Sequence, residues 1–152
     1  MYVTVQEYRD YAARLGTTLP AADADVTIQL EKASAYIDSK EPYLIGSRTE
    51  RGQDHAYPRS GLVINGFSYD DDEEPEIVKK CQMELALELN AGVDLYRDKT
   101  VLPVIKNRVE GAVEQQFASP SSVQAKQAES KAMSLLRQLM GPPKMSISLQ
   151  RV

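Results

Sequence analysis

The chain of 152 residues is poor in several residue types on which common functions depend. It has no Trp, two Phe, one His and one Cys, so the core must come mainly from aliphatic residues and from some of its eight Tyr. A single Cys, Cys81, excludes an internal disulfide and a Cys-based zinc site. The net charge of −4 excludes the overall basic character typical of nucleic-acid-binding domains, although a local basic patch remains possible.

Long apolar runs are also absent. No segment approaches the ~18 consecutive apolar residues of a transmembrane helix. The first residues lack the basic flank and apolar stretch of a signal peptide. We therefore expect a soluble protein of one domain, made in a reducing cytoplasm and with no membrane partner.

Apolar periodicity predicts a mainly α fold. A capping box of Thr4 and Glu7 opens a first helix that ends at Gly16. A second helix, residues 24–38, follows a short connector and has Asp23 or Asp25 as its candidate cap. Its apolar stripe consists of Val26, Leu30, Ala33 and Ile37. Because the connector is short, residues 4–38 are expected to form a helical pair.

The rest of the chain completes a predicted bundle of about four helices within a single domain, residues 1–152. Pro75 opens a core helix, residues 76–91, whose stripe includes Cys81. Residues 101–117 predict a short β-hairpin broken at Glu110 and Gly111. A helix over residues 123–140 ends at Gly141, and residues 144–152 predict an extended C-terminal arm.

Residues 39–75 show no sustained period and predict a long projecting loop. Loops of this length are usually functional or ordered by a partner. Arg48, Arg51, Tyr57 and Arg59 form an Arg–aromatic cluster within it. Three interpretations stay open: contacts to single-stranded nucleic acid, a protein interface, and solvated arginines paired with nearby acids.

Candidate catalytic and metal-binding sets are mostly missing. His55 lies in a polar segment without a nucleophile motif, which favours a solvated side chain. Cys81 is predicted to be buried and inert. The acidic run 70–74 lacks the ligand spacing of a calcium loop, so a solvated loop is favoured over a cation site or a contact with a basic partner. We expect no catalytic residues, no metal and no cofactor, and hence no enzyme.

Several short motifs follow one another along the chain: Leu30–Asp38, Gly46–Thr49, Gln53–Gly61, Pro75–Val78, Glu84–Leu87, Lys106–Phe117 and Leu135–Arg151. Their order resembles a family of tailed-bacteriophage proteins encoded among head and tail genes. Members resemble head–tail connector (adaptor, head-completion) proteins, and some carry the label DnaT-like single-stranded DNA-binding. Tyr57 replaces the usual Trp, and Glu110 is inserted beside the usual Val-Gly pair.

The resemblance implies a structural neck protein of the virion. Such subunits form a homo-oligomeric ring, here expected to be dodecameric, below the portal protein at the head–tail junction. They dock a tail terminator or another neck protein, and genomic double-stranded DNA passes through the channel without sequence-specific binding. The expected interface residues are Arg48, Arg51, Tyr57, Arg59, Ile147, Leu149 and Arg151. The alternative is a single-stranded DNA-binding accessory protein of phage replication, supported by the Arg–aromatic cluster.

Overall fold

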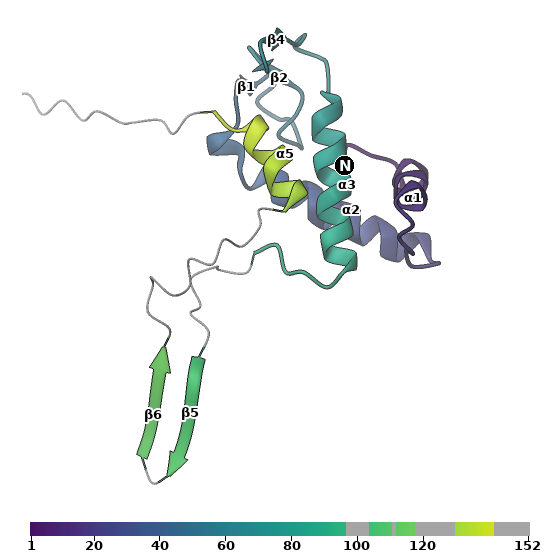
Figure 1. The fold of residues 1–152 in the computed structure, drawn as a ribbon. Helices are drawn as coiled ribbons and strands as arrows, with labels where there is room; N and C mark the ends of the chain where they lie inside the picture. The colour runs from purple at the N-terminus through teal and green to yellow at the C-terminus, as the bar shows by residue number, and fades with distance from the viewer. Residues whose placement is uncertain (97–103, 111, 118–129, 142–152) are drawn as a thin grey trace, which may run out of the picture. The chain divides into compact units, whose positions relative to one another are not determined.

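The structure, a computed structural model, describes residues 1–96, 104–110, 112–117 and 130–141 (Figure 1). The chain forms two compact units. The first contains Met1–Leu95 together with the segment that starts at Ser130, and the second is Tyr96–Glu129.

Four α-helices among the described residues build the first unit and confirm the mainly α prediction. They are α1 (Val5–Arg14), α2 (Asp23–Asp38), α3 (Glu76–Asn90) and α5 (Lys131–Leu139). Helix α3 packs against both α2 and α5, so it is the central element of the bundle (Figure 1). None of the described helices is long and apolar enough to cross a membrane.

The helix ends follow the predicted chemistry with one exception. Thr4 and Glu7 form the capping box, and Gly16 follows α1 with a positive φ of 70°. The prediction of an Asp cap on α2 is wrong, because Ala22 is the N-cap and no side chain caps the helix. Asp23 instead lies in the first turn, where its carboxylate favours the positive helix end and accepts a 2.7 Å hydrogen bond from Arg9.

The predicted stripes of α2 and α3 lie in the core. Val26, Leu30, Ala33 and Ile37 of α2 are fully buried. The apolar pattern did not reveal that α3 also buries a polar side chain, Gln82. Its Oε1 accepts a hydrogen bond from the Tyr2 backbone N–H at 3.0 Å, and its Nε2 donates to the Leu30 carbonyl at 2.8 Å. Gln82 therefore joins the N-terminal segment to α2 inside the core.

The segment predicted as a projecting loop is folded onto the core instead. It contains a 3₁₀ helix, η1 (Glu41–Tyr43), and two small antiparallel hairpins. The hairpins pair β1 (Ser47–Arg48) with β2 (Arg59–Ser60) and β3 (Val63–Ile64) with β4 (Phe67–Ser68). Apolar periodicity missed these strands because each is only two residues long. The segment buries Leu44, Ala56, Tyr57, Leu62 and Ile64.

Backbone hydrogen bonds join the beginning of this segment to the end of α5. Ile45 N–H donates to the Leu139 carbonyl, and Gly141 N–H donates to the Tyr43 carbonyl, both at 3.0 Å. Leu44 and Met140 form an isolated antiparallel bridge between these bonds. We call this set of contacts the backbone clasp. Of the predicted helix 123–140, residues 123–129 lie outside the described residues, as does the predicted arm 144–152.

The second unit contains the predicted hairpin. Strand β5 (Val104–Glu110) pairs antiparallel with β6 (Ala112–Phe117). The register places Val109 opposite Val113 and Glu110 opposite Ala112, so the strands end where the sequence predicted the break.

Replacing Gln82 with Leu tests the polar link in the core. The substitution leaves the Tyr2 N–H and the Leu30 carbonyl without their partner, and an unpaired buried polar group costs about 1–3 kcal/mol. We expect urea denaturation to show a loss of about 2 kcal/mol or more in unfolding free energy. Gln138→Leu, at an exposed position, is the control and should change stability little. Equal stability of the two variants would contradict this role of Gln82.

Candidate nucleic-acid interface

The structure separates the four residues of the predicted Arg–aromatic cluster. Tyr57 is 2% exposed and Arg59 is 4% exposed, so both belong to the interior. Arg48 is partly buried and only Arg51 is fully exposed. The four side chains therefore do not form one solvent-facing stacking platform. Whether any of them contacts a partner stays a prediction, and Ile147, Leu149 and Arg151 lie outside the described residues.

Arg59 links separate parts of the backbone of residues 39–75 through its side chain. Its guanidinium donates to the carbonyls of Ile45 at 2.8 Å, Gly46 at 2.7 Å and Ala56 at 3.2 Å. It also lies 6.0 Å from the centre of the Tyr57 ring. A guanidinium carries five N–H donors, so one side chain can satisfy several backbone acceptors that would otherwise be buried without partners.

Glu41 of η1 forms an ion pair with another arginine of the segment, Arg48. Arg48 donates to its two carboxylate oxygens at 2.5 and 2.7 Å and to the Gln53 carbonyl at 2.6 Å. Arg59 Nη1 lies 3.8 Å from Glu41 Oε1. Hydrogen bonding from Arg48 is the main reason why the pKa of Glu41 is lowered from its ordinary value of 4.5. Glu41 is therefore a neutralised acid near the start of the segment.

His55 is tied into the fold rather than free in solvent as predicted. Its Nδ1 lies 3.0 Å from Asp38 Oδ2, and its Nε2 forms a hydrogen bond with the Met1 amine. Asp38 also accepts hydrogen bonds from the Tyr2 hydroxyl at 2.6 Å and from the Ala56 N–H at 2.9 Å. Both ring nitrogens of His55 are thus engaged in contacts that order the N-terminus and the loop.

Cys81 is buried and the acidic run 70–74 is exposed, as the sequence predicted. Cys81 is buried, and burial raises the pKa of its thiol to about 12, which makes it a poor nucleophile. The acidic side chains are exposed. Within the described residues, no group of three or more His, Cys, Asp or Glu is placed to hold a metal ion.

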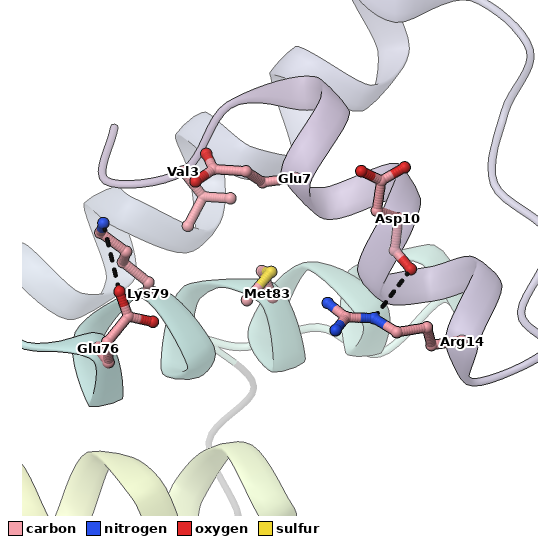
Figure 2. A pocket seen from close by; sticks show the side chains of 7 residues that line it. All are labelled: Val3, Glu7, Asp10, Arg14, Glu76, Lys79 and Met83. Carbon is pink, nitrogen blue, oxygen red and sulfur yellow. Dashed lines mark hydrogen bonds and ion pairs between the residues drawn. The ribbon is translucent and has the colours of Figure 1, made fainter.

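A groove of about 190 Å³ lies between α1 and α3 (Figure 2). Met83 and Val3 supply its apolar surface. Three carboxylates and two cations line the rest: Glu7, Asp10, Glu76, Arg14 and Lys79. Lys79 is itself 3.6 Å from the Glu76 carboxylate. The excess of negative charge makes this groove a poor site for a nucleic-acid phosphate.

Exposed aromatic side chains identify a different surface. Tyr43 of η1 is 64% exposed and Phe67 of β4 is 73% exposed. Phe67 is closely followed by the acidic run 70–74, which would repel phosphates. The acid beside Tyr43 is Glu41, which the two arginines neutralise. Tyr43 is therefore the better candidate for stacking with a base. Nothing in the loop composition singled it out.

Charge is unevenly distributed along the chain. Residues 1–95 and 130–141 hold 18 acidic and 11 basic residues, a net charge of −7. Residues 96–129 and 142–152 hold 4 acidic and 7 basic residues, a net charge of +3. Polyanion binding by the first unit must therefore use a local basic surface.

These features define a small, mainly helical protein with an internal Arg–Glu network and an exposed tyrosine shortly after the end of α2. The chain belongs to the family described as "Putative DnaT-like ssDNA binding protein", whose model matches residues 1–152. No curated protein and no solved structure matches the chain.

The family corrects the interpretation as a head–tail connector. The family whose model covers the whole chain is described by single-stranded DNA binding, not as a structural neck subunit of a virion. The predicted partners are wrong for the same reason: the portal protein, a tail terminator, a dodecameric ring of the chain itself and double-stranded DNA passing through it. The resemblance to DnaT-like proteins is the part of the sequence interpretation that is confirmed.

Arg59→Met tests whether this arginine is structural. The variant leaves three carbonyls without their donor, so we expect the free energy of unfolding to fall by about 3 kcal/mol or more. Arg51→Met is the matched control at an exposed position and should change it by less than about 0.5 kcal/mol. Urea denaturation of both variants gives the comparison. Similar losses in both would show that Arg59 does not hold the segment.

Acidification tests the Glu41 network. Because the pKa of Glu41 is lowered in the folded state, its contribution to stability is present above its ordinary value of 4.5 and is lost as the pH falls below it. Wild type should be more stable than Glu41→Gln near neutral pH, and the difference should shrink in acid. Thermal melts across this range measure it, with Glu50→Gln as the exposed control. A difference that stays constant with pH would exclude this role.

Proposed function

We propose that the chain is a single-stranded DNA-binding protein that acts as an accessory protein of phage replication. The observation that carries the proposal is the match of the family model to all 152 residues. Binding, not catalysis, is the proposed activity. The engaged ring nitrogens of His55 and the buried thiol of Cys81 support this, since neither is available to a substrate. Synthesis in the host bacterial cytoplasm stays a prediction. A location at the head–tail junction of the virion was expected together with the neck function and is not part of this proposal.

The surface chemistry supports DNA binding of a particular kind. An exposed tyrosine can stack on any base, because every base has a π-face, so little sequence preference is expected. Stacking requires an unpaired base, which favours single strands over duplex. The net negative charge of the chain opposes long-range attraction to DNA, so we expect affinity to depend on a few local phosphate contacts and to be weak at high salt.

Titration with a fluorescent oligo-dT tests the proposal. Log affinity should fall linearly with log salt between about 50 and 200 mM, with a slope of about 0.7 for each phosphate contact. A duplex of equal length should bind more weakly, because its bases are not available for stacking. No binding at the lower salt concentration, or tighter binding of the duplex, would contradict the proposed function.

A further inference from the structure

The C-terminal half of helix α2 carries its basic residues on one face. Lys32, Tyr36 and Lys40 are spaced four residues apart, the spacing that places side chains on one face of a helix. Lys40, just beyond the last residue of α2, keeps this alignment, since its Nζ lies 4.8 Å from the centre of the Tyr36 ring. Asp38 instead faces the N-terminal segment, where it accepts a hydrogen bond from the Tyr2 hydroxyl. Glu31, the neighbour of Lys32 in sequence, is turned about 100° away from it around the helix. In the C-terminal half of α2 the Lys–Tyr–Lys face therefore carries no acid, whereas Asp25 lies on the same side of the helix nearer its N-terminus.

Helix α5 adds a third basic residue beside this face. The hydroxyl of Tyr36 donates to Met133 Sδ at 3.8 Å, which fixes the side of α5 that adjoins the Lys–Tyr–Lys face. Arg137 follows Met133 by four residues, so it lies on the same side of α5, in the last turn, and is exposed. Helix α5 contains two basic residues and no acid.

The backbone clasp places Tyr43 between the ends of the two helices. Its carbonyl accepts the Gly141 N–H at 3.0 Å, and its own N–H donates to the Lys40 carbonyl at 2.9 Å. These hydrogen bonds with Lys40 and Gly141 fix the backbone of Tyr43, while its side chain is 64% exposed. A stacking residue on a fixed backbone loses little conformational freedom when it binds.

We propose that single-stranded DNA binds along this surface, which we call the basic–aromatic strip: Lys32, Lys40, Tyr43 and Arg137. The three basic side chains contact phosphates of the strand, and a nucleobase stacks on the Tyr43 ring. The one acid between Lys40 and Tyr43, Glu41, is neutralised by Arg48 and does not repel the strand. This assignment rests on the proposed function. It differs from the cluster expected from sequence, whose Tyr57 and Arg59 are buried.

Two variants of the full chain test the strip against the same oligo-dT. Tyr43→Ala should weaken binding by about fivefold to a hundredfold, because stacking on an aromatic side chain contributes that much per base. Lys32→Gln combined with Lys40→Gln should reduce the salt slope by about 0.7 for each phosphate that these lysines no longer neutralise. Both variants change side chains that are not fully buried, and thermal melts check that they fold.

Matched controls separate the strip from the rest of the surface. Lys80→Gln removes an exposed basic side chain of α3, and Arg51→Gln removes the exposed arginine of the predicted cluster. Neither should change the affinity more than about twofold or alter the salt slope. If wild type binds with steep salt dependence and the strip variants bind equally well, the strip is wrong and the proposed function stands. If wild type does not bind, the proposed function itself fails.

Tyr43→Trp gives a direct reading of stacking, because the chain has no other Trp. Its fluorescence should be quenched by oligo-dT, and Trp should retain the affinity that Ala loses. Binding without any change in Trp emission would show that the base does not stack at this position.

Discussion

The buried guanidinium of Arg59 is the contact on which the arrangement of residues 39–75 depends. This segment has too little regular secondary structure to pair its own backbone, and Arg59 supplies donors to three of its carbonyls. Glu41 lies close enough to offset part of its charge, and Arg48 forms the closer ion pair with the same carboxylate. The same network therefore closes the segment and keeps the acid of η1 from repelling a polyanion beside Tyr43.

The helices could be predicted from sequence because they depend on local chemistry. The capping box at Thr4 and the apolar stripe of α2 are both readable in one dimension, and both are confirmed. The small hairpins could not be read in this way. Each strand has two residues, and what stabilises them is a buried arginine and burial of Tyr57 against the rest of the core. Contacts between distant residues carry no periodic signal.

The candidate site shows the same difference between what local sequence predicts and what contacts between distant residues determine. An arginine in a polar segment predicts a surface contact, because arginine is seldom buried. Arg59 departs from that average because backbone carbonyls surround it. The spacing of Lys32, Tyr36 and Lys40 was visible in sequence, but only the contact of Tyr36 with Met133 brings Arg137 of α5 to the same surface. Binding surfaces assembled from separate helices need the tertiary structure.

The backbone clasp has a consequence for how the chain can vary. It joins residues 43–45 to residues 139–141 and so attaches the end of α5 to an earlier part of the first unit. The first unit therefore consists of chain segments that precede and follow Tyr96–Glu129. In the sequence, Tyr96–Glu129 is an insertion between two anchored points. Doubling the length of a flexible insertion costs only about 0.6 kcal/mol in closure entropy. Relatives of this chain can therefore differ greatly in length here while keeping the same helical body.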